Sequence, residues 1–306
     1  MSIQSDTIID RRRLKRRLIF WQVIGVCAIA LAIIIAVGRL GGFSGGQDRI
    51  ARIAVEGIIL DDTFRDKTLN DIASDDHIKA LVVTIDSPGG TFVGGESLYN
   101  QLRKITSEKP VVALMGGTAT SAAYMTAIGA DRIFARAGTL TGSIGVILQT
   151  ADVTEFLGNI GVKPVIIKSA PLKAQPNPME AFSDAARVAT EAVVHDFFEQ
   201  FVDMVTVRRD LSRSEVSALA DGRVFSGRQA MTNGLVDAIG ALEEARNWLA
   251  DEKNISKDLP VVDVSLVPED KPWRNLFTGL IGKTLLSERL GLDGVISLWH
   301  PALKLR

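Results

Sequence analysis

Residues 79–86 read KALVVTID, and this stretch decides the fold because it is a short, nearly continuous apolar run. Such a run is typical of a strand covered on both faces, as strands are in a parallel sheet. Ser87-Pro88-Gly89-Gly90 follows it and ends the strand with bare backbone. Outward from here, the sequence predicts strands over 50–60 and 111–115 and helices over 66–76 and 95–105. This alternation predicts an α/β domain.

The chain beyond residue 115 continues the alternation. The expected elements are a helix over 121–129, strands over 132–135, 144–149 and 163–168, and a long helix over 180–209 with apolar residues every three or four positions. Ser212 with Glu215, and Ser226 with Gln229, have the spacing of capping boxes that begin two further helices. Gly234 is expected to end the second of these helices.

The N-terminal region indicates where the chain works. Residues 18–38 are 21 residues without a charged side chain, and a helix of that length reaches about 30 Å, the thickness of a hydrocarbon core. Six of the seven residues 11–17 are Lys or Arg, which keeps that end cytoplasmic. We therefore expect one transmembrane helix, with the chain from Arg39 onward across the membrane. A cleaved signal peptide is the alternative, although the apolar segment is longer than a usual h-region.

Composition excludes several classes of function. Residues 1–17 carry six basic and two acidic side chains, or +4, so the remaining chain carries −5 of the net charge of −1 and has no basic footprint for nucleic acid. The one cysteine, Cys27, lies in the apolar span, so the exported part has no disulfide, thiol nucleophile or cysteine-ligated metal. No dinucleotide-binding or P-loop spacing is present. We expect no cofactor, no metal and no nucleic-acid partner.

Residues 116–129, GGTATSAAYMTAIG, are the first candidate site. A buried strand leads through a Gly/Thr turn into a helix that begins at Ser121, which would expose a hydroxyl beside backbone N–H groups that lack an intrahelical partner. Ser121 could equally be an ordinary N-cap serine, since such serines are far more numerous than nucleophiles. The Gly89-Gly90 turn could bring bare backbone to a substrate or could be a plain turn.

A serine nucleophile needs a base. The histidines are His77, His195 and His300, and none of them lies in a Gly/Pro-rich loop. Lys173 lies in a loop with uncharged, mostly apolar neighbours, and burial among apolar groups favours the neutral form of an amine, which can accept the serine proton. A surface lysine is the alternative interpretation, and Lys168 is the nearest rival.

Together these segments resemble the signal peptide peptidase A family, membrane-anchored serine proteases with a ClpP/crotonase-like fold, a spiral of ββα units. The resemblance covers Arg49 to about Asn254, and in its length and single catalytic domain the chain looks like the short bacterial form of the family. The segments that carry it are Ile85–Gly90, Ser121–Tyr124, Gly129–Asp131, Thr139–Val146, Asp221–Ala230 and Gly234–Asp237. Many relatives have glycine where Ala122 stands here, and this difference could narrow the substrate groove.

The resemblance implies roles for individual residues. It places the nucleophile at Ser121, the general base at Lys173 and an orienting hydroxyl at Ser143, with oxyanion donors from the backbone N–H groups of Ala122 and the Gly89-Gly90 turn. It also implies a homo-oligomeric ring in which neighbouring subunits complete the dyad. The implied substrates are remnants of cleaved signal peptides. The implied location is the bacterial inner membrane, with the catalytic domain on the periplasmic side.

Five regions are expected along the chain. They are a basic cytoplasmic N-terminus (1–17), a transmembrane anchor (18–38), a Gly-rich tether (39–48), a protease domain (49–254) and a C-terminal extension (255–306). The apolar and basic residues from 273 to 306 fit a helix packed on the domain, an interfacial helix touching lipid, or a tail that occupies the substrate groove. The sequence leaves these three interpretations open.

Three other functions remain as alternatives. A broader quality-control protease of the cell envelope would act on misfolded proteins. A crotonase-type enzyme acting on acyl thioesters would share the fold and the Gly-Gly oxyanion turn, but it needs no nucleophilic serine. A non-catalytic scaffold would keep the fold after losing activity, and the intact set of Ser121, Lys173 and Ser143 argues against that.

Overall fold

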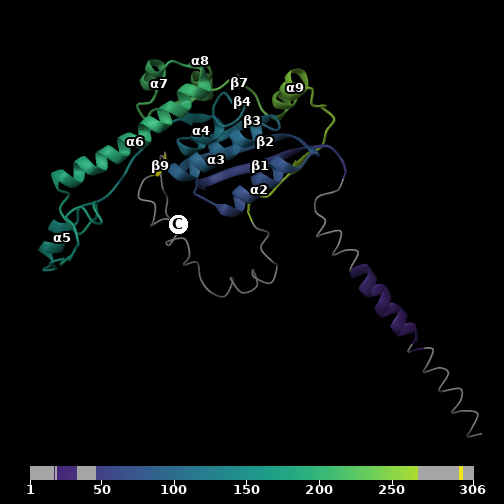
Figure 1. Ribbon diagram of the computed structural model, residues 1–306, viewed down its shortest axis with the longest axis horizontal. Helices are drawn as coiled ribbons and strands as arrows, with labels where there is room; N and C mark the ends of the chain where they lie inside the picture. Colours follow the sequence, from purple (N-terminus) through teal and green to yellow (C-terminus); the bar gives the residue numbers. More distant parts are fainter. Residues whose placement is uncertain (1–16, 18, 33–45, 268–295, 299–306) are drawn as a thin grey trace, which may run out of the picture. The chain divides into compact units, whose positions relative to one another are not determined.

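The computed structural model describes residues 17, 19–32, 46–267 and 296–298, which belong to two units, Met1–Gln47 and Asp48–Arg306 (Figure 1). Within the first unit, residues 19–32 form a helix with mostly exposed side chains. Among the described residues, no helix is both long and apolar enough to cross a bilayer. The predicted anchor 18–38 extends past this helix, and its residues 18 and 33–38 lie outside the described ones.

The second unit is built on one mixed sheet, mostly parallel, in the order β6-β5-β3-β2-β1-β8, with β4, β7 and β9 paired to its side. The strands are β1 (Arg49–Ile59), β2 (Ile78–Thr91), β3 (Val111–Thr120), β4 (Arg132–Ala135), β5 (Leu140–Gly142), β6 (Val224–Ser226), β7 (Ala238–Ile239), β8 (Val261–Asp263) and β9 (Ile296–Leu298). The predicted α/β class is therefore confirmed. Residues 261–263, in the region expected to be an extension, add a strand beside β1.

Side chains alternate between the two faces of β2, which explains why its residues 80–85 are almost wholly apolar. Leu81, Val83 and Ile85 point into one core, whereas Ala80 and Val82 point into a smaller core on the opposite face. Helices cover both faces (Figure 1). They are α2 (Thr63–Ser74), α3 (Phe92–Thr106), α4 (Ala122–Ala127), α5 (Thr154–Asn159), α6 (Asp184–Arg209), α7 (Arg213–Leu219), α8 (Gly227–Thr232) and α9 (Leu242–Lys253).

Both capping boxes form as predicted. Ser212 and Glu215 exchange side-chain and backbone hydrogen bonds at the start of α7, and Ser226 and Gln229 do the same for α8. Gly234 follows α8 with a φ of +77°, the left-handed conformation that ends many helices.

Two predicted strands are absent. Residues 144–149 contain a single bridge residue, and 163–168 form no strand at all. The side chains of Val165 and Ile167 are 85% and 96% exposed. Apolar side chains are expected to be covered from water. Here the chain's own sheet leaves the side chains of Val165 and Ile167 exposed.

We call the segment between β5 and α6 the arm, and it is covered less by the domain core than the rest of the second unit is. In Figure 1, α6 extends beyond the sheet and α5 lies near its far end. The buried residues of α6 are mainly in its second half, namely Phe201, Val202 and Val205, with Ala186 the exception near the start. The first half of α6 and the arm therefore receive little cover from the domain core.

Gly90 lies directly beside the backbone of Ile59 in β1. A Cβ atom added there would lie 1.9 Å from the backbone oxygen of Ile59, its partner in the register. We predict that Gly90→Ala lowers the free energy of unfolding by about 3 kcal/mol or more, because the obstructing atom is backbone and must move. Gly138→Ala is the control, since nothing lies within 4 Å of a Cβ there. Urea denaturation of both variants checks this, and equal stability would contradict it.

Candidate active site

Ser121 lies between the last residue of β3 and the first residue of α4, as the sequence predicts. It occupies the N-cap position of α4, yet its side chain does not cap the helix. Its φ and ψ are 59° and −121°, a conformation that L-residues rarely adopt. Its backbone N–H donates to Gly142 O at 2.8 Å, which ties the turn to β5. The geometry therefore differs from that of an ordinary capping serine, which has extended backbone and bonds to its own helix.

Strained backbone coincides with the predicted site residues. Among the described residues, five that are not glycine have positive φ: Ser121, Ser143, Ala174, Asp210 and Asn254. The last two are left-handed C-caps of α6 and α9, where this conformation is common. The other three are Ser121, Ser143 and the immediate neighbour of Lys173. Such conformations cost free energy and persist mainly where function requires them.

The prediction that Ser87-Pro88-Gly89-Gly90 ends the strand is wrong, because β2 continues through these residues to Thr91 and pairs Gly89 and Gly90 with Ile58 and Ile59 of β1. The residue before Ser121 contacts this part of β2. Thr120 Oγ1 donates to Pro88 O at 3.0 Å. Ser87 Oγ donates to Gly57 O and accepts from Gly89 N at 3.1 Å, which ties this end of β2 to β1. Gly89 has a φ of +113°, so glycine is required there for conformation, as it is at Gly90 for packing.

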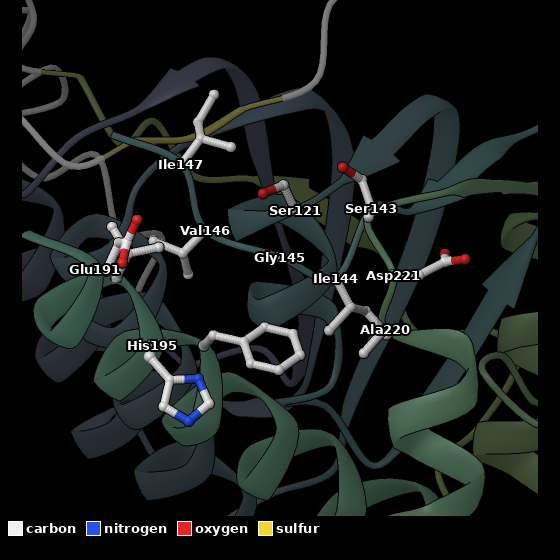
Figure 2. Close-up of a pocket in the computed structure, with 13 residues that line it drawn as sticks. Ser121, Ser143, Ile144, Gly145, Val146, Ile147, Glu191, His195, Ala220 and Asp221 are labelled. Carbon is white, nitrogen blue, oxygen red and sulfur yellow. The ribbon is translucent and has the colours of Figure 1, made fainter. Parts of the chain in front are cut away.

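Ser143 reaches the same place from the end of β5. Its backbone N–H donates to Arg223 O at 2.8 Å, so the Asp221–Ala230 segment positions it. Ser121 and Ser143 both line a cavity of about 560 Å³, and Figure 2 shows them together on one side of it. The structure thus brings together Ser121, Ser143 and, at the base of α4, the buried Ala122.

Most of this cavity is apolar. Its other walls come from the segment after Ser143, from one face of α6 and from the start of the α7–β6 loop. The residues are Ile144, Gly145, Val146, Ile147, Glu191, Val194, His195, Phe198, Ala220, Asp221 and Gly222. The α6 members recur at intervals of three and four, so they form one helical face. The sequence predicts apolar residues every three or four positions along this helix, but not that this face lines the site.

Among the described residues, His195 is the one histidine that lines the cavity. Figure 2 places it at the end opposite Ser121, and its side chain is 72% exposed and 3.8 Å from Glu199. His77 is at the start of β2 and interacts with Asp48. These positions give Ser121 no histidine base within the described residues, and His300 lies outside them.

Lys173 is not among the described residues that line the cavity, and its side chain is exposed in the arm. Lys168, its rival, is held elsewhere. The Lys168 amine donates to Glu180 Oε2 and to Pro171 O, each at 2.9 Å. The bond from Lys168 to Glu180 is the first cause of the lowered pKa of the Glu180 carboxyl. Gln175 and Asn177 also donate to Glu180 Oε2. Lys168 therefore serves as the cation that closes the loop carrying Lys173.

The segment after α8 holds α4 in place from behind. Tyr124, fully buried, donates to Leu235 O at 2.9 Å, and its burial raises the pKa of the phenol. Asp237 accepts from Ile133 N at 2.7 Å and pairs with Arg209 at 2.8 Å. The Gly234–Asp237 motif is thus structural: it anchors the helix that follows Ser121.

Comparison with known proteins shows which family the chain belongs to. Residues 103–256 match the model of Peptidase family S49, which is about half of the chain. The chain belongs to peptidase family S49. It is 36% identical over 235 residues to a protein of Synechocystis named as a protease, covering 76% of this chain and 84% of that one. It is therefore a serine protease of this family.

This S49 peptidase is also similar to two further proteins. An Enterococcus faecium protein named as a signal peptide peptidase, SppA, is 33% identical over 196 residues, which cover 64% of this chain and 57% of the relative. A solved structure of a membrane-bound stomatin-specific protease has 14% identity and a TM-score of 0.47, covering 72% of this chain and 98% of that one.

Backbone strain at Ser121 predicts an unusual ranking of variants. Ser121→Gly and Ser121→Ala both remove the hydroxyl, but only glycine adopts a positive φ without penalty. We predict that the glycine variant unfolds with a free energy about 1 kcal/mol higher than the alanine variant, the reverse of the usual order. Thermal or urea denaturation of the pair measures this, with Ser217→Gly and Ser217→Ala, inside α7, as the unstrained comparison in which the alanine variant should be the more stable. A Ser121→Ala variant that is equally or more stable than Ser121→Gly would contradict the strain.

Proposed function

We propose that this S49 peptidase is a membrane-anchored endopeptidase with a Ser/Lys dyad, in which Ser121 is the nucleophile, Lys173 the general base and Ser143 the hydroxyl that orients the lysine. The observation that carries the proposal is the strained backbone at Ser121, at Ser143 and beside Lys173, since the other non-glycine residues with positive φ in the part of the chain that the structure describes are helix caps. Ser121 and Ser143 also share the cavity.

The proposed reaction has two halves. The uncharged Lys173 amine takes the Ser121 proton as Oγ attacks the peptide carbonyl, and the backbone N–H groups of Ala122 and of Gly89-Gly90 stabilise the oxyanion. The lysine then gives its proton to the leaving amine, which breaks the peptide bond and leaves an acyl-enzyme. A water molecule, deprotonated by the same amine, releases the acid and restores Ser121.

The base is proposed to come from a neighbouring subunit. Lys173 is exposed and absent from the described lining of its own chain's cavity. The arm that carries it exposes large apolar side chains: Phe156, Ile160, Val162, Val165, Ile166, Ile167, Leu172 and Met179. Exposed apolar surface of this kind marks an interface. A cyclic homo-oligomer, in which each arm covers the next subunit's cavity, would bury that surface and complete each site.

The substrate class is proposed from the sequence and the cavity together. The predicted anchor 18–38 and short tether 39–48 would keep the protease domain near the outer surface of the inner membrane. Remnants of signal peptides are apolar and lie there, and the cavity beside Ser121 is lined largely by Ile, Val and Phe. The name of the Enterococcus relative favours the same substrates. The proposal retains the ClpP/crotonase-like spiral, which the strand–helix succession from β1 to α4 supports.

Family membership and the apolar cavity bear differently on the alternative functions. Family membership favours peptide hydrolysis over acyl thioester chemistry and over a non-catalytic scaffold. A broader quality-control protease remains the second candidate, since an apolar cavity would also accept segments of misfolded proteins.

Mixing two inactive chains tests the shared dyad. Ser121→Ala and Lys173→Ala subunits should each be inactive alone, because either change removes one half of the dyad. Co-expressed in equal amounts in a ring, they should recover about one quarter of wild-type turnover of an apolar fluorogenic peptide, since one neighbour pairing in four joins an intact serine to an intact lysine. A chain with both Ser121→Ala and Lys173→Ala, mixed with either single variant, is the control and should recover no activity, because one member of the dyad is then missing from every chain. A Ser/Lys mixture without activity would contradict sharing, and activity in both single variants would refute the dyad.

Paired substrates distinguish the two protease functions. We predict that kcat/KM for a synthetic signal peptide in detergent or bilayer exceeds that for a reduced, unfolded globular protein by about tenfold or more, because the apolar cavity and membrane proximity both favour the former. The Ser121→Ala variant gives the background for each assay. Equal or faster cleavage of the unfolded protein would favour quality control instead.

A further inference from the structure

The loop that carries Lys173 is closed around one carboxylate oxygen. Three side chains donate to Glu180 Oε2, namely Lys168 Nζ at 2.9 Å, Gln175 Nε2 at 2.8 Å and Asn177 Nδ2 at 2.6 Å. One donor precedes Lys173 in the chain and two follow it, so Glu180 holds both sides of the loop at the same point. A charged carboxylate accepts such bonds more strongly than a neutral oxygen does.

Two further hydrogen bonds fix the tip of this loop. Lys173 N donates to Ala170 O at 3.1 Å. Asn177 Nδ2, one of the donors to Glu180, also donates to Ala174 O at 3.0 Å, and Ala174 has a left-handed φ of +59°. The hydrogen bonds that run from Glu180 through Asn177 therefore end on the strained residue next to Lys173.

Glu180 also joins the loop to the domain core. It lies three residues before Ser183, whose side chain accepts from Ala186 N and begins α6. The second half of α6 is buried in the core, so the helix places its own start, and with it Glu180, relative to the sheet. The position of Lys173 relative to its own domain is thus fixed through α6 and Glu180.

We propose that Glu180 is a positioning residue for peptide hydrolysis, which holds the loop in the shape in which the Lys173 amine meets the Ser121 hydroxyl. This inference rests on the proposed function, because it takes Lys173 to be the general base. Glu180 acts through Lys173 and not on the reacting atoms, since three donors from its own loop already occupy its Oε2 oxygen.

The exposure of the loop makes such a residue necessary. Leu172, Lys173 and Ala174 are all exposed, so packing against their own domain does little to define where the tip lies. A lysine side chain is a flexible four-carbon stem, and a reacting group displaced by about 1 Å can lower turnover about 100-fold. Bonds inside the loop must therefore fix the backbone of Lys173, and Glu180 accepts three of them.

Steady-state kinetics of Glu180→Ala test the positioning. The change removes the shared acceptor and leaves Ser121 and its cavity intact, so kcat for an apolar fluorogenic peptide should fall about 10- to 100-fold with KM unchanged. Glu180→Gln keeps the shape and one carbonyl acceptor without the charge, and its kcat should fall less. Glu155→Ala, exposed on α5 in the same arm, is the matched control and should keep both constants. A wild-type kcat in Glu180→Ala, or a change in KM alone, overturns the proposal.

Mixed rings separate positioning from folding and assembly. In a mixture of Ser121→Ala and Lys173→Ala chains, each active site joins the serine of the Lys173→Ala chain to the arm of the Ser121→Ala chain. Glu180→Ala should remove about nine-tenths or more of the recovered activity when it is placed in the Ser121→Ala chain, and none when it is placed in the Lys173→Ala chain. A defect in folding or assembly would lower activity in both placements, so equal losses overturn the proposal.

The same variants distinguish a failure of this proposal from a failure of the dyad. If Lys173→Ala keeps full turnover, the proposed function fails, and the positioning of Lys173 fails with it. If Lys173→Ala is inactive while Glu180→Ala has the wild-type kcat, the dyad stands and the positioning alone fails. If the parent mixture recovers no activity, sharing between subunits fails, and the kcat and KM of Glu180→Ala by itself still decide the role of Glu180.

Discussion

The site depends on the departure of β3 from β2. The two strands pair up to Ser87↔Ala119, after which β3 moves to β5 and the backbone turns sharply at Ser121 into α4. The turn is held from both sides, by Ser121 N donating to Gly142 O and by Thr120 Oγ1 donating to Pro88 O. The departure opens an edge on β2 and leaves the serine beside it. The strain at Ser121 persists because the surrounding hydrogen bonds over-determine it.

Much of this arrangement could be predicted from the sequence. The near-continuous apolar run of 79–86 gave a strand buried on both faces, and the capping boxes at Ser212 and Ser226 placed α7 and α8. These signals are local: an apolar run, a hydroxyl and a carboxylate or amide three residues apart. The pairing of Ser121 with Ser143 in one cavity is not local, and it came from the family resemblance rather than from spacing.

The failures have a common cause. Residues 163–168 were expected to form a strand because they are apolar, yet Val165 and Ile167 are exposed. Hydrophobicity shows that a side chain avoids water, but it does not show whether its cover comes from the same chain. The same limit applies to Lys173, whose neighbours in the sequence are mostly apolar although its side chain is exposed. The α6 wall of the cavity was missed because a helix of 26 residues presents more than one face, and the sequence does not say which face meets the site.

The central claim is that a lysine on an apolar arm completes a strained serine on another subunit. The most direct measurement is an experimental structure of the assembled full-length protein, from which the distance between Ser121 Oγ and Lys173 Nζ can be read within and between chains. The account predicts hydrogen-bond reach, about 2.6–3.2 Å, between neighbouring chains and a much larger separation within each chain. A lysine amine far from the serine hydroxyl in every pairing of subunits would contradict it.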